Sequence, residues 1–354
     1  CVALRESGIP VCAAAPSAQA ARVLAQATGV QATTLHALLA DLREPTRTPA
    51  HGCVIIDEAS MADTHTLTAA IDGVTRAGGR VVLVGDPAQL PAVGPGGLFA
   101  ALTHEVRTAE LVGNRRQAAE WERTALHDLR DGNAQRALAA YAEHGRITTT
   151  RTPEHTTARM VDDWWTSARK SGLQQAVMLA HRNRDVDSLN QQARERMRDD
   201  HQLGEERIYG GTALAVGDQV ICRHNDYDLG VRNGTRGTID QLATTGVVVR
   251  TDAGETLELP ADYADQHVRH GYALTVHAAQ GATVKEAFVL ASDQSQLAEW
   301  GYVALTRARE GTRIYLTEPT REPTMALDPG GRGGLDDLAR AMTRPTAEPL
   351  GIQQ

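Results

Sequence analysis

Two carboxylates follow directly after a short apolar run in the first third of the chain. Val54, Ile55 and Ile56 precede Asp57 and Glu58, which predicts a buried strand whose carboxyl end presents two acids. In nucleotide hydrolases an Asp at such a place binds the magnesium ion of MgATP, and an adjacent Glu orients the attacking water. Two solvated acids at a strand end would give the same local pattern, so the pair alone leaves both interpretations open.

A second polar loop follows another apolar run. The run 81–84 leads into Gly85, and Gln89 lies a few residues further on. Glycine lets the backbone approach a neighbour closely, and the Gln89 amide can sense a γ-phosphate or hold a water molecule. In open parallel sheets, ligands bind beyond the carboxyl ends of the strands. Two such loops in succession therefore predict a nucleotide site.

These loops need a sheet to position them, and the sequence predicts a parallel one. Apolar strands at 9–15, 53–56 and 80–84 alternate with helices such as the alanine-rich segment 18–28, and Gly8 is expected to cap the helix before the first strand. Alternation of this kind is typical of a parallel sheet with helices on both faces.

The same alternation returns in the second half of the chain, around an insertion. A strand at 176–180 and a helix at 186–197 precede the segment 208–260, where short β-like runs are separated by Gly, Asn and Asp turns. Strands at 287–291 and 313–317 then resume the α/β pattern. We therefore predict an α/β protein with two parallel-sheet lobes and a small β-barrel or meander inserted in the second.

Helical periodicity predicts a helical region at 118–143. It also predicts a short helix at 335–342, within a tail that is rich in Pro and Gly. The predicted division is a first lobe at 1–112, a helical region and the start of the second lobe at 113–205, the inserted β-barrel at 206–264, the rest of the second lobe at 265–318, and a linker or tail at 319–354.

Composition indicates a globular protein without a membrane span. The chain has 354 residues, 42% hydrophobic and 23% charged, and no apolar run long enough to cross a bilayer. Neither its four cysteines nor its histidines have metal-ligand spacing, which predicts reduced thiols in a cytoplasmic protein.

A net charge of −8 gives no sign of nucleic-acid binding, yet a local positive groove could still bind a single strand of DNA. Three tryptophans could stack on bases, but core packing is the favoured role for Trp164, Trp165 and Trp300.

The ordered loops resemble the motifs of superfamily 1 DNA helicases along nearly the whole chain. Asp57-Glu58-Ala59-Ser60 resembles their Walker B motif, and the stretch 85–91 resembles motif III, which links the γ-phosphate to the DNA strand. Asn114-Arg115-Arg116-Gln117 is similar to motif IV, where Arg116 has the place of the arginine that reaches the γ-phosphate. The stretch 302–309 is similar to motif VI, with Arg307 in the arginine-finger place.

This resemblance implies two RecA-like lobes of the P-loop NTPase type, with ATP and Mg²⁺ as cofactors. The implied catalytic residues are Asp57, which would bind Mg²⁺ through ATP, together with Glu58, Gln89, Arg116 and Arg307; the other implied nucleotide-binding residues are Gly85, Asp86, Gln280 and Gly281. Phosphoryl transfer needs positive charge around the γ-phosphate, and arginines of a second lobe supply it when the lobes close. Both candidate arginines lie outside the first predicted lobe, as that scheme requires.

Three further stretches resemble loops that contact DNA. The stretch 15–17 is similar to motif Ia, the stretch 34–36 to the next strand-contacting loop, and the stretch 275–281 to motif V, which contacts the DNA backbone and couples it to ATP. The resemblance implies single-stranded DNA as partner and no membrane. The implied DNA-binding residues are Pro16, Ser17, Thr34, His36, Thr275 and His277.

The insertion indicates which branch of the superfamily the chain resembles. The run 217–220, with Tyr227 and the pair Asn233-Gly234, is similar to the small SH3-like barrel of the RecD-like branch, which implies 5′ to 3′ movement. The stretch 121–147 resembles the helicase part of conjugative relaxases. This implies a role in plasmid transfer and a relaxase domain upstream in the parent chain. A RecD-like DNA repair helicase is the alternative.

One helicase motif is missing from the sequence. A P-loop reads Gly-x-x-x-x-Gly-Lys-Ser/Thr, but the only lysines, Lys170 and Lys285, follow Arg and Val. We therefore expect a first lobe truncated before residue 1, and a fragment that hydrolyses little or no ATP by itself. The rival interpretation is a non-catalytic module that binds single-stranded DNA or a protein. The other motif residues are intact, which favours the fragment, and the reading frame upstream of Cys1 would distinguish the two.

Overall fold

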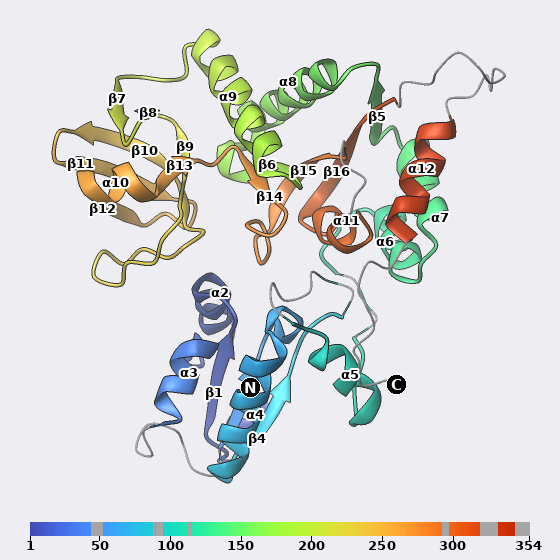
Figure 1. Cartoon of the computed structure of the whole chain (residues 1–354), viewed down its shortest axis with the longest axis vertical. Coiled ribbons are helices and arrows are strands. Elements are labelled where there is room, and N and C mark those ends of the chain that lie inside the picture. Colours follow the sequence, from blue (N-terminus) through green and yellow to red (C-terminus); the bar gives the residue numbers. More distant parts are fainter. Residues whose placement is uncertain are drawn as a thin grey trace. The chain divides into compact units, whose positions relative to one another are not determined.

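The computed structural model describes residues 1–43, 52–87, 89, 95–111, 113, 115–291, 297–318 and 332–343. They form two compact units, one within Cys1–Val112 and the other within Gly113–Thr346 (Figure 1). Each unit contains its own parallel sheet.

The first unit contains a four-stranded parallel sheet in the order β2-β1-β3-β4. Its strands are β1 (Val11–Ala15), β2 (Ala32–Thr34), β3 (Cys53–Ile56) and β4 (Arg80–Leu83). Its helices are α1 (Val2–Glu6), α2 (Ala18–Thr28), α3 (Leu35–Asp41), α4 (Thr64–Arg76) and α5 (Leu98–Glu105), with the 3₁₀ turn η1 (Ala59–Met61) after β3.

Alternate residues of β3 build the two hydrophobic faces of this sheet. Val54 and Ile56 pack with residues of α3 and α4, whereas Cys53 and Ile55 pack with residues of the α1 and α2 side. A strand that is apolar on both faces is typical of a parallel sheet covered on both sides, and the prediction of that arrangement is confirmed. β4 is the outer strand of the described sheet, and Val82 on it is 43% exposed.

The end of α1 differs slightly from the prediction. The C-cap is Ser7, and Gly8 follows it with a left-handed φ of 70°. The Ile9 amide donates to the Leu4 carbonyl 3.0 Å away, which is the hydrogen bond of a Schellman helix end. Gly8 is therefore the residue after the cap, and the strand begins at Val11 instead of Ile9.

The second unit contains a five-stranded parallel sheet in the order β14-β6-β15-β16-β5. Its strands are β5 (Ile147–Thr150), β6 (Ala176–Ala180), β14 (Ala273–Thr275), β15 (Val284–Leu290) and β16 (Ala308–Thr317). Its helices are α6 (Glu120–Arg130), α7 (Ala134–Glu143), α8 (Pro153–Ser171), α9 (Asn183–Asp199), α11 (Leu297–Leu305) and α12 (Arg332–Thr343), with the 3₁₀ turn η2 (Leu173–Gln175) before β6.

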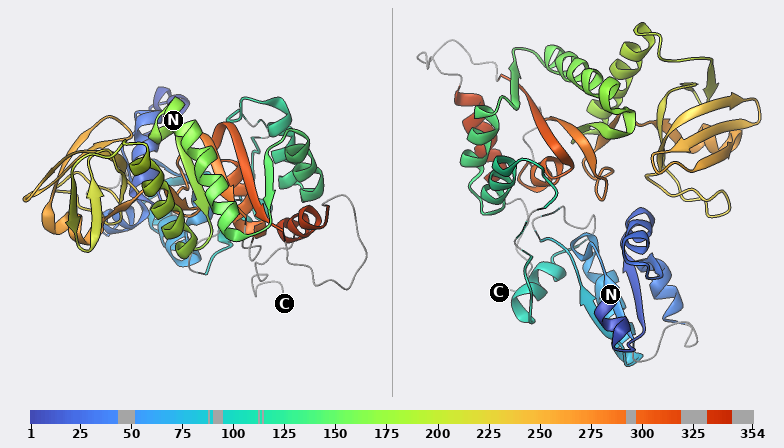
Figure 2. Two further views of the ribbon diagram at one scale, coloured as in Figure 1. Left: turned by 90° about the horizontal axis from the view of Figure 1, so that it is seen from above. Right: turned by 180° about the vertical axis from the view of Figure 1, so that it is seen from behind.

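Helices α8 and α9 lie side by side along this sheet (Figure 2). Trp164 and Trp165 of α8 belong to the hydrophobic core between these helices and the sheet, and they are at most 4% exposed. Trp300 of α11 is 1% exposed. The three tryptophans pack in the protein core, as predicted, which leaves little ring surface for stacking on bases.

The insertion is a small β domain with its own hydrophobic core. An antiparallel sheet in the order β12-β11-β10-β9-β13 and the hairpin β7-β8 form it. The bounds are β7 (Glu206–Tyr209), β8 (Thr212–Ala215), β9 (Gln219–Cys222), β10 (Arg236–Ala243), β11 (Gly246–Thr251), β12 (Thr256–Pro260), α10 (Ala261–His267) and β13 (Val268–His270). The predicted β meander is confirmed, and its closure into an SH3-like barrel stays a prediction.

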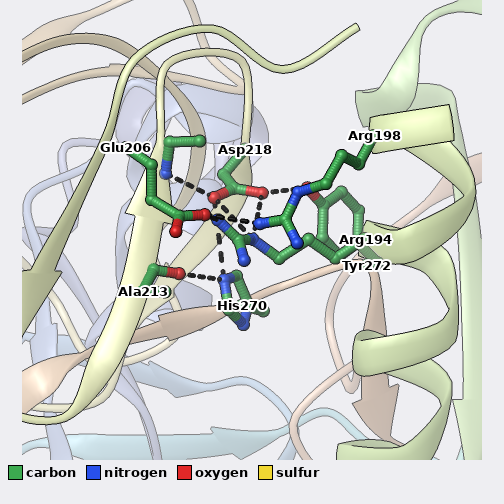
Figure 3. Close-up of polar contacts among 8 residues, drawn as sticks. Arg194, Arg198, Glu206, Ala213, Asp218, His270 and Tyr272 are labelled. Carbon is green, nitrogen blue, oxygen red and sulfur yellow. Dashed lines mark hydrogen bonds and ion pairs between the residues drawn. The ribbon is translucent and has the colours of Figure 1, made fainter. Parts of the chain in front are cut away.

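A buried polar network joins the insertion to the α/β part of its unit (Figure 3). Arg194 of α9 donates from Nε to both carboxylate oxygens of Asp218, at 3.2 and 3.1 Å. The Tyr272 hydroxyl also donates to Asp218, and the His270 ring lies 3.7 Å from it. Arg194 reaches Glu206 of β7 as well, at 2.5 Å. Because Asp218 is fully buried, removing one partner would leave an uncompensated charge in the interior.

Other sequence predictions concern thiols, metals and membranes. All four cysteines are free. In the described part of the chain, no three His, Cys, Asp or Glu side chains gather where they could bind a metal ion. None of the described helices combines the length and apolar character needed to cross a membrane.

Candidate functional site

The Asp57–Glu58 turn begins where β3 ends. The Asp57 amide donates to the Ala14 carbonyl on β1 at 2.9 Å, and the Asp57 Oδ1 atom accepts from the Glu58 amide at 2.9 Å. Glu58 has φ 51° and ψ 37°, a left-handed conformation that costs a residue with a Cβ atom about 1–3 kcal/mol. His201 is the only other described non-glycine residue with positive φ. Such conformations cluster at functional sites, which agrees with the role predicted for Glu58.

The second predicted loop lies against this turn. The Ala59 amide donates to the Val84 carbonyl at 2.9 Å. A Cβ atom on Gly85 would lie 3.2 Å from the Ala59 nitrogen and 3.1 Å from Phe99 Cζ, which is closer than nine in ten real contacts of that kind. Glycine at this position therefore lets the loops after β3 and β4 touch. The structure thus brings Asp57, Glu58 and Gly85 together, as the sequence predicted.

The rest of the second loop is described only in part. Asp86 is half-buried, and its carbonyl accepts from the Gln89 amide at 3.0 Å. Ala88 and the stretch 90–94, which includes the end of the stretch 85–91 that resembles motif III, lie outside the described residues.

Two predicted DNA-binding residues cap helices at the same edge of the first sheet. Ser17 caps α2, where its hydroxyl accepts from the Ala20 amide at 3.1 Å, and Thr34 caps α3, where its hydroxyl accepts from the Ala37 amide at 3.2 Å. Ala15 pairs with Thr34 in the β1–β2 ladder, so the two helix N-termini are neighbours. The unpaired amides at a helix N-terminus favour phosphate groups. Pro16 is half-buried beside Ser17 and His36 is exposed in the first turn of α3.

In the second unit, Thr275 is the last residue of β14 and begins a tight turn. Its hydroxyl accepts from the Ala278 amide at 3.2 Å. His277 is exposed, and its carbonyl accepts a hydrogen bond from the backbone amide of the half-buried Gln280 at 3.2 Å. Gly281 follows with a left-handed φ of 81°. The predicted residues of this stretch therefore share one loop at the carboxyl end of a parallel strand, where ligands bind in such sheets.

The two predicted arginines both contact the backbone segment that ends α11, although Arg116 is 190 residues from Thr306 in the sequence. Arg116 is exposed and donates from Nη1 to the Thr306 carbonyl at 3.1 Å. Arg307 is only 3% exposed, and its Nε atom donates to the Val303 carbonyl at 2.8 Å. Asn114, at the start of the same predicted motif, lies outside the described residues.

Two buried polar residues, Gln117 and Glu122, were given no role by the sequence analysis. Gln117 is 1% exposed and donates to the carbonyls of Thr306 and Ala308. Glu122 is fully buried and accepts from the Thr312 amide at 3.1 Å. A signal for Glu122 was present, because it falls on the same face of α6 as the buried residues of that helix.

Two protein-family descriptions match parts of the chain. Residues 2–152 match the AAA domain. Residues 270–315, which include Thr275 and Arg307, match the UvrD-like helicase C-terminal domain.

The chain is also similar to curated bacterial proteins. It is 35% identical over 267 residues to the conjugal transfer protein TraA of Rhizobium radiobacter, which covers 74% of this chain and 24% of that protein. It is 33% identical over 316 residues to the ATP-dependent RecD2 DNA helicase of Deinococcus radiodurans, with 86% of this chain and 42% of that protein covered. The chain thus spans about a quarter of the length of TraA.

Solved structures share its fold. Pif1 of Bacteroides bound to single-stranded DNA superposes with a TM-score of 0.56 at 18% identity, covering 88% of this chain and 84% of that one. Bacteroides Pif1 in complex with ADP-AlF3 and single-stranded DNA gives a TM-score of 0.55 at 17% identity, covering 92% and 86%. The predicted α/β architecture with parallel-sheet lobes is therefore that of a helicase fold.

Proposed function

Because the chain belongs to superfamily 1 of the helicases, on the RecD-like branch and related to conjugative relaxases, we propose that it forms most of an ATP-driven DNA motor. The parent protein would couple ATP hydrolysis to 5′ to 3′ movement on single-stranded DNA, in the cytoplasm and during conjugative plasmid transfer. The likeness to TraA supports transfer as the setting. The likeness to RecD2 keeps DNA repair as the alternative.

The observation that carries this proposal is the strained turn after β3. Glu58 has a left-handed backbone directly beside Asp57, and Gly85 permits the next loop to approach. A carboxylate at this place offers the hard oxygen ligand that Mg²⁺ prefers. We assign Asp57 to the magnesium ion of MgATP and Glu58 to the attacking water. Bound MgATP would supply the phosphoryl group and the metal charge.

The remaining predicted residues would each contribute one function. Gln89 would sense the γ-phosphate, while Gly85, Asp86, Gln280 and Gly281 would line the nucleotide. Arg116 and Arg307 would neutralise the charge that develops during phosphoryl transfer, which is the main demand of that reaction.

DNA contact is assigned to three helix or strand ends. Ser17 and Thr34, with their neighbours Pro16 and His36, would hold phosphates at the N-termini of α2 and α3. Thr275 and His277 would contact the DNA backbone from the loop after β14. Contacts of this kind are largely independent of sequence and weaken as salt rises.

The test is ATP hydrolysis with and without single-stranded DNA, measured on this chain and on a chain extended upstream through its reading frame. No Gly-x-x-x-x-Gly-Lys-Ser/Thr stretch occurs within the 354 residues, so we expect DNA-stimulated turnover only in an extended chain that contains one. Glu58→Gln should abolish it, and Glu105→Gln, at an exposed acid of the same unit, should not.

Two results would contradict the proposal. If the extended chain is folded and binds DNA without hydrolysing ATP, a non-catalytic binding module replaces the motor. If Glu58→Gln leaves turnover unchanged, the assignment of Glu58 is wrong even though the helicase family stands.

A further inference from the structure

Gln117 connects the segment before α6 to the turn that carries Arg307. Its side chain is 1% exposed. The Nε2 atom donates to the Ala308 carbonyl at 2.8 Å and to the Thr306 carbonyl at 3.4 Å. A glutamine amide has two N–H donors, so one side chain holds the backbone on both sides of Arg307. The shorter contact is a strong hydrogen bond, and the longer one is at the limit.

The neighbours of Gln117 bind the same segment. Arg116 donates from Nη1 to the Thr306 carbonyl at 3.1 Å, and the Ala118 amide donates to the Arg309 carbonyl at 2.7 Å. Three successive residues thus lie along the backbone from Thr306 to Arg309. Among these hydrogen bonds, those of Gln117 are buried and are therefore the costliest to break, because a broken one leaves a desolvated polar group.

The Arg307 side chain depends on the conformation of this turn. Its Nε atom donates to the Val303 carbonyl and its Nη2 atom to the Thr306 hydroxyl, both at 2.8 Å. Thr306 is therefore held by Gln117 through its backbone and contacts Arg307 through its side chain. A shift of the Thr306–Ala308 turn would move both the origin of the Arg307 side chain and one of its partners.

We propose that Gln117 is a positioning residue that sets the place of Arg307 by fixing the backbone on both sides of it. The inference rests on the proposed role of Arg307 in ATP hydrolysis. Gln117 itself touches no nucleotide in this scheme. Arg116 donates a hydrogen bond to the same Thr306 carbonyl, so Gln117 would influence the positions of both arginines.

The first test uses Gln117→Met, which keeps the length of the side chain and removes its donors. An arginine finger is worth about 10³–10⁵ in rate, and a displacement of about 1 Å can cost about 100-fold. We expect kcat for DNA-stimulated ATP hydrolysis by the extended chain to fall about 10- to 100-fold, with KM for ATP within about twofold of wild type. Gln117→Glu keeps the side-chain shape, replaces the NH₂ group with oxygen, and should give the same loss.

Gln219→Met is the matched control. Gln219 is also fully buried, but its Nε2 atom donates to Asp252 at 2.8 Å within the β insertion. We expect it to leave kcat within about twofold of wild type. An equal loss of kcat in the Gln219 variant would show that any buried glutamine matters, and would overturn the proposal.

A double-mutant cycle separates positioning from general damage. If Gln117 acts through Arg307, then Gln117→Met should cause no further loss of kcat in an Arg307→Ala background. Independent, multiplying losses would overturn the proposal.

A second measurement uses the 354-residue chain and needs no ATP hydrolysis. The Arg307 Nε–H resonance, identified by its loss in Arg307→Lys, should exchange slowly in the wild type because this group is buried and hydrogen-bonded. In Gln117→Met it should shift and exchange at least about tenfold faster, whereas Gln219→Met should leave it unchanged. An unchanged resonance in Gln117→Met would overturn the proposal. A shifted resonance without wild-type ATP turnover would support positioning and reject the proposed function instead.

Discussion

The Arg116 guanidinium donates a hydrogen bond to the carbonyl oxygen of Thr306, 3.1 Å away and 190 residues further along the chain. Thr306 directly precedes Arg307. Two stretches that resemble separate helicase motifs are therefore joined within one unit. The Arg116 side chain therefore contacts the residue that directly precedes Arg307.

Replacing Arg116 should separate its chemical role from that of an ordinary surface arginine. We expect Arg116→Ala to lower kcat for ATP hydrolysis by about 100-fold or more, because it removes positive charge proposed to face the γ-phosphate. Arg115 is also exposed and is adjacent to Arg116, so Arg115→Ala serves as the control and should change kcat by less than about threefold. Equal losses in the two variants would contradict the assignment of Arg116.

Relieving the strain at Glu58 should stabilise the protein while removing activity. Glu58→Gly takes away the Cβ atom that disfavours φ 51°, and we expect about 1 kcal/mol of added stability against urea. His201 has φ 55° and no predicted catalytic role, so His201→Gly should stabilise by a similar amount and keep ATP turnover. A loss of stability in Glu58→Gly would show that the left-handed turn is not strained.

How far the sequence predicted the fold depends on the kind of element. The strands Cys53–Ile56 and Ala176–Ala180 match their predictions at both ends, because each is a short apolar run bounded by polar residues or glycine. β5, Ile147–Thr150, was missed because it is short and mostly threonine. α8 was also missed, although Thr152 and Pro153 form a recognisable helix start.

The sequence predicted which site residues lie together only where the order of the strands determines their positions. Asp57 and Gly85 follow strands that are neighbours in the sheet, so their proximity follows from the strand order. The burial of Arg307 did not follow from its sequence, because arginine is normally exposed and its partners depend on how α11 ends. The contact between Arg116 and Thr306 links two distant segments, and no local pattern predicts such a pairing.

Gly85→Ala should test the contact between the two loops of the first unit. The added methyl group would meet Ala59 and Phe99 at 3.1–3.2 Å, so we expect a loss of about 1–3 kcal/mol in unfolding free energy. Gly113→Ala adds a methyl group where nothing lies within 4 Å, and it should change stability by less than about 0.5 kcal/mol. Urea unfolding measures both, and an unaffected Gly85→Ala protein would mean that the loops do not touch.

The network around Asp218 should make the attachment of the insertion sensitive to acid. Burial raises the pKa of Asp218, but the nearby His270 ring, the hydrogen bond from Tyr272 and the charge of Arg194 outweigh it and hold the pKa below the ordinary 3.8. A depressed carboxyl pKa stabilises the fold above the unfolded-state value, and this stability is lost as pH falls through the folded-state pKa.

Asp218→Asn should therefore cost about 3–5 kcal/mol at pH 7, because it leaves Arg194 without a buried counter-ion. The difference from wild type should shrink as pH falls below about 3.8, because the carboxyl then binds a proton in the unfolded state while it is still ionised in the folded state. Asp240 pairs with Arg250 at the exposed surface, so Asp240→Asn is the control and should change little. Urea unfolding followed between pH 7 and pH 3 measures both, and a difference that does not depend on pH would contradict this account.

Glu122 should behave in the opposite way. Burial raises its pKa above the ordinary 4.5, against hydrogen bonds from Tyr141 and Thr312 and the charge of Arg146. The charged form is thus disfavoured in the folded state, and wild-type stability should fall as pH rises from about 4.5 through the folded-state pKa. Its Oε2 atom has no hydrogen-bond partner among the described residues, whereas Oε1 accepts both hydrogen bonds.

Glu122→Gln keeps the Oε1 acceptor and removes the buried charge. We expect it to raise the unfolding free energy by about 1 kcal/mol at pH 7, with no gain below about pH 4.5, where the wild-type carboxyl is neutral in both states. Glu122→Ala removes the acceptor as well, leaving the Tyr141 hydroxyl and the Thr312 amide unpaired, so it should destabilise at every pH. A stability difference between wild type and Glu122→Gln that stays constant from pH 4 to pH 8 would show that Glu122 is not held in a charge-disfavouring site.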